Sequence, residues 1–133
     1  MYPIDARNQL MITFITWAED EGIVYAIDNQ SFSNPEDTYI IFKVIFNGGS
    51  QVSLGNIGSR KYDTYGLIVA EVYTVQNTGT NTNDEICETV LELFDGQNIN
   101  DIILTNGHIS TGGNINGYYL QTVTCEFMFE LTR

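Results

Sequence analysis

The stretch TYIIFKVIF, residues 38–46, decides the fold of this chain of 133 residues. Its β-branched and aromatic residues favour an extended strand. Alternate side chains of a strand point to opposite faces, and here both faces are apolar except at Lys43. One face carries Ile40, Phe42, Val44 and Phe46, and the other carries Tyr39, Ile41 and Ile45. Because such a strand is apolar all round, the sequence predicts that it is covered on both faces.

A second strand of the same kind follows a glycine-rich segment. Residues Tyr62–Val75 again place apolar side chains on both faces, with Leu67, Val69 and Tyr73 opposite Ile68, Ala70 and Val72. The intervening segment, Asn47–Lys61, contains four glycines and one short β-like piece, Gln51–Leu54. The two strands and the segment between them predict a long β-hairpin whose tip projects past the body of the sheet.

Helical periodicity occurs twice in the chain. Between Asp5 and Asp20, apolar side chains recur at helical spacing at Ala6, Leu10, Phe14 and Trp17. A second helix is expected over Asn83–Phe94, because Thr82 and Glu85 have the spacing of a capping box and Gly96 suits a C-terminal stop. Its core stripe is predicted to be Ile86, Val90 and Leu93 or Phe94, flanked by Cys87 and Leu91.

The remaining segments are interpreted as strands and turns. A short strand, Ile23–Ile27, precedes a polar turn over Asp28–Asp37. Two further strands, about Asp101–Ser110 and Tyr118–Thr132, are joined by a loop over Thr111–Gly117. The order of helix, strands, helix and strands predicts one α+β domain over residues 1–133. We expect a mixed, mainly antiparallel β-sheet, two helices packed on one face and a long projecting β-hairpin.

The charge balance disfavours two classes of partner. The chain carries 17 acidic and 5 basic residues, which gives a formal net charge of -12. This charge forfeits the counterion release that drives nucleic-acid binding, and it opposes docking on anionic membranes. The sequence has neither a signal-peptide pattern nor an apolar run near the roughly 20 residues that span a bilayer. We therefore expect a soluble protein made in a cytoplasm.

No residue pattern indicates a catalytic, metal or cofactor site. The lone histidine, His108, lacks the nucleophile and orienting acid of a catalytic motif. Glu85, Glu88 and Glu92 line the second helix opposite its apolar stripe, as on any solvated helix face. Cys87 and Cys125 are interpreted as buried apolar residues rather than as a disulfide. We expect a protein that is not an enzyme and needs no cofactor.

The basic pair Arg60-Lys61 is the only cluster of positive charge in the sequence. The glycine-rich segment before it leads into a strand, whereas a phosphate-binding loop opens a helix. Phosphate binding is therefore not expected. Two interpretations of the pair stay open: a solvated turn, or an electrostatic contact to an acidic neighbour such as the next copy of the chain.

Several pieces of the chain, in their order, resemble one family. Asp5-Ala6-Arg7 leads into a helix with Phe14 and Trp17. Then come Gln51-Val52-Ser53-Leu54-Gly55, Gly58, Arg60, Tyr62 and Gly66, the strand Val69–Tyr73, a polar loop into the second helix, and Tyr118-Tyr119-Leu120-Gln121. These pieces are similar to the tail-terminator and tail-completion proteins of long-tailed bacteriophages, of the type found in phage lambda. Family members typically carry more basic residues around the hairpin, whereas here Tyr62, Asp63 and Thr64 follow Lys61.

The resemblance implies a structural protein of the virion, in its tail or neck, after assembly in the host cytoplasm. Such proteins form a ring, usually of six copies, that docks on the head-proximal end of the tail tube, stops tube polymerisation and offers a surface for the neck. The implied partners are further copies of the chain, the tail-tube protein and a neck or head-completion protein, while DNA passes through the lumen without specific binding. The expected contact residues in the hairpin are Gln51, Val52, Ser53, Leu54, Gly55, Arg60, Lys61 and Tyr62.

Other functions stay open at the level of sequence. Within the virion, the chain could be a head-completion protein or neck adaptor, or the tail-tube subunit itself. A tube subunit polymerises alone into long cylinders, which electron microscopy of the purified protein would reveal. From another class, a small acidic enzyme or ligand-binding module would need converging polar groups beneath the tyrosine-rich last strands, and the sequence shows none.

Overall fold

The chain forms one six-stranded sheet with two helices in the computed structural model, which describes residues 1–27, 37–53, 55–76 and 79–133. The elements are α1 (Pro3–Asp20), β1 (Val24–Ile27), β2 (Tyr39–Gln51), β3 (Lys61–Val75), α2 (Asn81–Phe94), β4 (Asn98–Ile99), β5 (Ile102–Ile115) and β6 (Tyr118–Thr132). Their order in the sheet is β1-β2-β3-β6-β5-β4, with β1 parallel to β2 and every other pair antiparallel. The predicted α+β fold is confirmed. The polar turn predicted over Asp28–Asp37 lies outside the described residues, except for Asp37.

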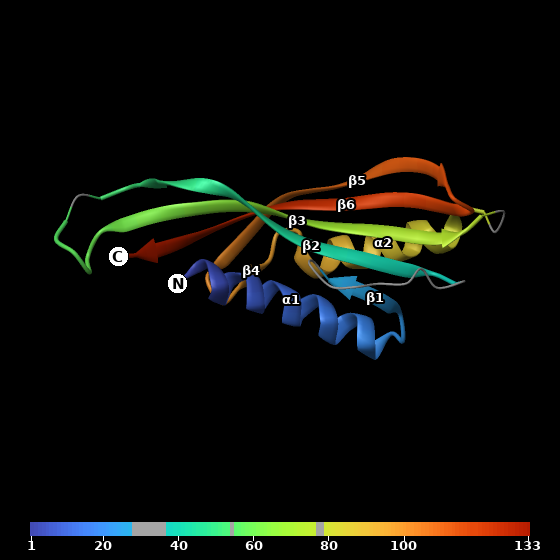
Figure 1. Ribbon diagram of the computed structural model, residues 1–133, viewed down its shortest axis with the longest axis horizontal. Helices are drawn as coiled ribbons and strands as arrows, with labels where there is room; N and C mark the ends of the chain where they lie inside the picture. Colours follow the sequence, from blue (N-terminus) through green and yellow to red (C-terminus); the bar gives the residue numbers. More distant parts are fainter. Residues whose placement is uncertain (28–36, 54, 77–78) are drawn as a thin grey trace.

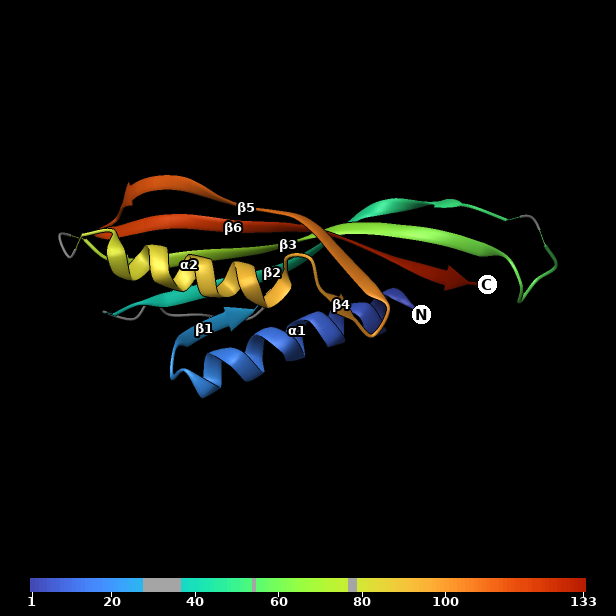
Figure 2. The same ribbon diagram turned by 180° about the vertical axis from the view of Figure 1, so that it is seen from behind.

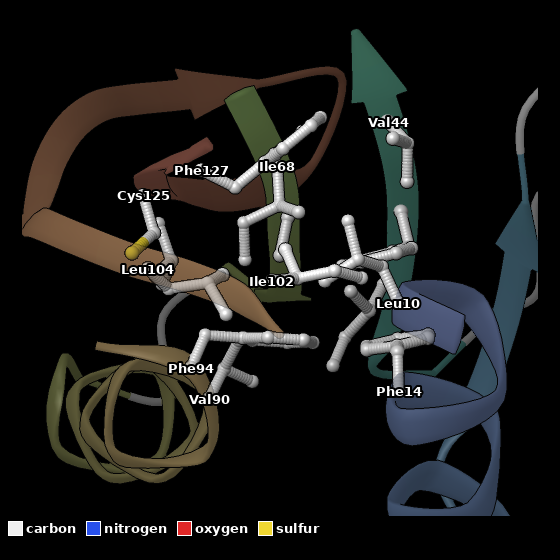
Figure 3. Close-up of a cluster of buried hydrophobic side chains, with 14 of the residues drawn as sticks. Leu10, Phe14, Val44, Ile68, Val90, Phe94, Ile102, Leu104, Cys125 and Phe127 are labelled. Atoms are coloured by element: carbon white, nitrogen blue, oxygen red, sulfur yellow. The ribbon is translucent and has the colours of Figure 1, made fainter. Parts of the chain in front are cut away.

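Both helices pack on the same face of the sheet, as predicted (Figures 1 and 2). The core between the helices and the sheet is closed by aromatic rings, because Phe42 of β2 lies between Phe14 of α1 and Phe94 of α2. The ring centroids are 4.4 Å and 5.6 Å from that of Phe42. Ile68 of β3 and buried residues of β5 and β6 complete the cluster (Figure 3). Among the described residues no helix is both long and apolar enough to cross a membrane.

The second helix differs from its predicted form. It begins at Asn81 and Thr82 lies inside it, so the expected capping box at Thr82 is wrong, and no side chain caps its first turn. Its buried stripe is Asn83, Cys87, Val90 and Phe94, whereas Ile86 and Leu93 are only partly buried. The stripe is displaced because the Asn83 side chain turns into the sheet, where its amide donates to the backbone oxygens of Val72 and Tyr119, each at 3.0 Å.

The last two strands form a longer hairpin than predicted. β5 continues to Ile115, so the loop expected over Thr111–Gly117 is wrong. Only Asn116 and Gly117 separate β5 from β6, and their φ angles of 49° and 84° fit the type I′ turn that Asn-Gly favours. The two-residue strand β4 was not predicted, because so short a piece shows no alternation.

The β2–β3 hairpin projects from the body of the sheet, as expected (Figure 1). β2 runs through its glycines to Gln51, with an irregularity in register between Phe46 and Gly48. Of the short β-like piece predicted at Gln51–Leu54, Gln51 ends β2, Val52 and Ser53 belong to no strand, and Leu54 lies outside the described residues. The end of β6 also pairs with β3 along this projection, with Lys61 opposite Thr132. The projection is therefore three-stranded, and we call it the projecting arm: 48–51 of β2, 61–65 of β3 and 128–132 of β6.

Aromatic packing connects the projecting arm to the body. Phe46 lies at the base of the arm, with its ring 5.6 Å from that of Phe127 and 6.4 Å from that of Phe129. On α1, the Arg7 guanidinium lies 5.0 Å from the centre of the Phe46 ring, within the range of a cation–π contact. Gly66 makes room at this point, because a Cβ there would collide with the Phe127 ring. These contacts hold the arm in a fixed direction relative to the helices.

Candidate assembly interface

The structure brings the predicted hairpin residues together at the end of the projecting arm. Gln51 lies opposite Tyr62, and the Val52 backbone N–H donates to the Lys61 carbonyl at 2.9 Å. The Ser53 hydroxyl accepts a hydrogen bond from the Lys61 backbone N–H at 3.1 Å. Gly55 and Arg60 belong to the loop that follows; Leu54 lies outside the described residues. We call the described residues 52–53 and 55–60 the hairpin tip.

Positive charge gathers at this end of the molecule. Arg60 and Arg133 exchange two backbone hydrogen bonds of 2.8 Å and 2.7 Å, so the C-terminal arginine lies beside the predicted Arg60-Lys61 pair. Lys61 faces Glu130 at 3.7 Å, but both side chains are about half exposed, so this ion pair contributes little. Three of the five basic residues of the chain therefore stand together on the arm. The sequence did not reveal this cluster, because Arg133 is remote from the hairpin along the chain.

The sheet face opposite the helices, which we call the open face, is largely apolar at its centre. Among the described residues no helix covers this face. Its apolar side chains are partly or well exposed, with exposed fractions of 41% for Ile45, 41% for Tyr65 and 44% for Ile103. Half-buried side chains that share the face are Ile41, Leu67, Val69 and Met128. β2 and β3 thus carry apolar side chains on both faces, and within the described residues the helices cover only one of the two faces, whereas cover on both was predicted.

The polar groups on the open face are paired within the copy. Lys43, which interrupts the apolar face of β2, makes an ion pair of 2.9 Å with Glu71 of β3. The Tyr73 hydroxyl donates to the same carboxylate at 3.1 Å, and burial together with the negative charge of Glu71 raises the pKa of Tyr73 to about 12. Asn106 donates to Glu126 at 2.5 Å. Lys43, Glu71 and Tyr73 are therefore paired within the copy and Glu126 has one partner, so the exposed apolar side chains are the groups of this face that gain most from a further partner.

Each side of the sheet ends in a length of strand with a free backbone edge. β1 pairs with β2 only over Tyr39–Phe42, so within the described residues the outer edge of β2 is unpaired from 43 to 51. On the other side β4 pairs only with Ile102 and Ile103 of β5, and Leu104 bonds to the 96–97 backbone. The described structure places no strand beside β5 from 105 to 115, although the Gly107 N–H donates to the Asp95 carboxylate at 2.9 Å, so the edge is partly occupied at that residue. Free edges of this length are templates for pairing with another chain.

Residues with possible chemistry do not converge. His108 is an exposed residue of β5, and Glu85, Glu88 and Glu92 are exposed along α2. In the described parts of the chain no group of three or more His, Cys, Asp and Glu side chains could hold a metal ion. Cys87 and Cys125 are buried and not disulfide-bonded, and burial raises the pKa of each thiol to about 12. The two cysteines are thus core residues, as interpreted from the sequence.

Comparisons with known proteins extend the description of the fold. No family model matches the chain. None of the curated proteins matches it either. Among solved structures, a protein whose name does not describe a function superposes on 96% of this chain and on 97% of its own length. The TM-score is 0.68 and the sequence identity is 12%. At this identity the likeness shows that the two proteins share a fold.

Proposed function

We propose that the protein is a structural subunit of a bacteriophage tail, a tail terminator that assembles into a ring on the head-proximal end of the tail tube. The observation that carries the proposal is the combination of an uncovered apolar sheet face with two free strand edges. The similarity of the hairpin residues to the tail-terminator family supports the same function. The ring partners are further copies of the chain, usually six in that family.

The order of the strands permits head-to-tail pairing between copies. β2 is antiparallel to β3, β3 to β6, and β6 to β5, so β2 and β5 run in opposite directions. When copies are related by rotation about a ring axis, the free edge of β2 can therefore meet the free edge of β5 of the next copy as an antiparallel pair. A contact between two different surfaces closes into a ring when the rotation between copies permits.

Two kinds of interaction would stabilise the proposed contact between copies. Covering a side chain that is about four-tenths exposed, such as Ile45, Tyr65 or Ile103, stabilises the assembly by roughly 1 kcal/mol each. Each backbone hydrogen bond between paired edges adds about 0.5–1.5 kcal/mol. The loss of free motion on association costs about 4–15 kcal/mol, so edge pairing and apolar burial are both required.

The proposed ring would stop tube polymerisation through the shapes of its two faces. In the proposed assembly one ring face complements the tail tube, and the opposite face offers no template for a further tube ring but a surface for the neck or head-completion protein. With a net charge of -12, the ring does not attract the phosphate backbone. DNA therefore passes through the lumen without specific binding.

The test removes the hairpin tip and leaves the sheet intact. Because the Val52 N–H already bonds to the Lys61 carbonyl, the segment Ser53–Arg60 can be replaced by an Asn-Gly turn at that point. The variant is expected to unfold at nearly the wild-type temperature but to lose the ring mass in analytical ultracentrifugation, and to leave tail tubes uncapped in electron micrographs. Ile12→Ser, which removes an exposed apolar side chain from α1, is the control. If the shortened variant still capped tubes at normal length, the proposed role of the hairpin would be refuted.

A further inference from the structure

One apolar side chain of the hairpin tip is almost fully exposed. Ile57 is 89% exposed, the largest exposed fraction among the large hydrophobic residues described. It is held by a turn in which the Ser59 N–H donates to the Asn56 carbonyl at 3.0 Å. Gly58 follows with a φ of 95°, which is the glycine position of a type II turn. The turn therefore presents Ile57 outward on a defined backbone.

A pocket of about 300 Å³ lies on the open face at the base of the arm. Its apolar wall is a row across three strands, because Tyr65 of β3 lies opposite Met128 of β6, which lies opposite Ile103 of β5. Its polar rim consists of Asn47, Thr105 and Glu126. A water molecule occupies about 30 Å³ in the liquid, so the pocket has room for about ten such volumes. This space is ample for the four side-chain carbons of an isoleucine.

The charges of the hairpin tip and of the open-face pocket are complementary. Arg60 and Lys61 follow Ile57 by three and four residues; Arg133 is joined to Arg60 through the backbone, and Lys61 faces Glu130 at 3.7 Å. At the rim of the pocket Glu126 is exposed, and Asn106 donates to only one of its carboxylate oxygens. An apolar anchor with basic neighbours thus matches an apolar pocket with an acidic rim.

The edge pairing of the proposed ring brings the two places together. When β2 lies antiparallel to β5 of the next copy with Gln51 near Thr105, the hairpin tip falls beside Ile103 of that copy. There β4 already occupies the outer edge of β5, at Ile102 and Ile103. The tip therefore cannot continue the strand pairing and passes onto the face of the sheet, where the pocket lies.

From these observations we propose that the hairpin tip of each copy docks in the open-face pocket of the next copy, with Ile57 as its apolar anchor and Glu126 as a partner of the basic pair. The proposal rests on the proposed ring, and it names the contact that sets the spacing between copies. It also gives a reason for the basic pair on an acidic chain, because the pair has an acidic surface of the neighbour to meet.

Disulfide trapping between separate chains tests the contact. An Ile57→Cys chain carrying a tag is mixed with an untagged Ile103→Cys chain and oxidised mildly; the buried wild-type cysteines do not compete. We expect a tagged–untagged cross-link at least ten times more abundant than in a control mixture, in which Ile12→Cys replaces Ile57→Cys. Ile12 is also exposed, at 57%, but lies on α1. Both tip and control positions are exposed, so neither substitution affects folding.

The outcomes separate this contact from the ring itself. A selective cross-link supports the docking. Equal cross-linking in the two mixtures, in particles that keep the mass of a ring, overturns the docking and leaves the ring. A protein that remains monomeric and gives no cross-link overturns both. As a second measurement, Ile57→Asp is expected to raise the dissociation constant of the assembly at least tenfold relative to Ile12→Asp.

Discussion

Asn83 is expected to be the polar residue on which the position of α2 depends most. It is fully buried, and its amide donates to the backbone oxygens of Val72 and Tyr119 at 3.0 Å and to the Thr74 hydroxyl at 3.1 Å. Its side-chain oxygen accepts a hydrogen bond of 3.1 Å from the Gln121 amide. The amide has two hydrogens for three acceptors, so they share its donors. Asn83→Ala removes all of these bonds and leaves a buried gap between α2 and the sheet.

The loss of stability in Asn83→Ala follows from the buried polar groups that lose their hydrogen-bond partner. A buried polar group without a partner costs about 1–3 kcal/mol, and carbonyls that keep one sheet bond lie at the low end. With two carbonyls and part of the Gln121 amide affected, we expect Asn83→Ala to lower the free energy of unfolding by about 3 kcal/mol. For a domain of this size that is a fall of roughly 10–15 °C in melting temperature.

Urea unfolding followed by circular dichroism measures this difference. Wild type and variants are compared at one protein concentration, because assembly adds a concentration-dependent contribution to stability. Asn81→Ala is the matched control, since Asn81 is exposed on the same helix, and its effect should stay within about 0.5 kcal/mol. If Asn83→Ala came within 1 kcal/mol of Asn81→Ala at an unchanged slope, the reasoning that this network fixes the helix would be refuted.

Four further predictions concern packing, the two thiols and the sheet edge. Gly66→Ala should lower the free energy of unfolding by at least about 1–3 kcal/mol in the same urea assay, because its methyl group would collide with the Ile45 carbonyl oxygen and the Phe127 ring. Cys87 and Cys125 should resist iodoacetamide at pH 8 until the protein unfolds, as mass spectrometry would show. Because their pKa rises from 9.0 to about 12 on folding, their contribution to stability is full below pH 9 and is lost as the pH rises toward 12, which urea unfolding across that range checks. Ser110→Lys adds a charge to the free part of β5 and should abolish the ring mass in native mass spectrometry without lowering the melting temperature by more than about 2 °C.

The central strands could be predicted because their own side chains determine them. β2 and β3 are apolar on both faces over many residues, and this pattern requires a sheet whatever surrounds it. The start of α2 could not be read in the same way. Thr82 and Glu85 have the spacing of a capping box, but the bonds of Asn83 to two remote strands decide which turn of the helix faces the core. Tertiary contacts of this kind leave no periodic trace in a sequence.

Of the two surfaces in the candidate interface, the sequence predicts the hairpin but not the pocket. Glycines and a basic pair mark the hairpin in the sequence, and the contact residues that the family resemblance implies for it stay a prediction. The length of β5 could have been predicted from Asn116-Gly117, because this dipeptide favours a two-residue hairpin turn and therefore a strand that continues to Ile115. The pocket carries no such signal. It is assembled from β3, β5 and β6, and only the register of the sheet places Tyr65 beside Met128 and Met128 beside Ile103.

The two free edges argue for a ring rather than a two-fold dimer. A dimer built by pairing β2 with β2 would cover one edge of each copy and leave β5 exposed from 105 to 115, so the hazard of an open edge would persist. Head-to-tail pairing of β2 with β5 would cover the unpaired lengths of both strands in every copy and leave only the short outer strands β1 and β4 at the edges. It also carries the hairpin tip toward the apolar row of Tyr65, Met128 and Ile103, which a β2–β2 dimer would leave to solvent. In the proposed ring, one repeated contact would therefore account for the length of the arm, the unpaired part of β5 and the exposed row of Tyr65, Met128 and Ile103.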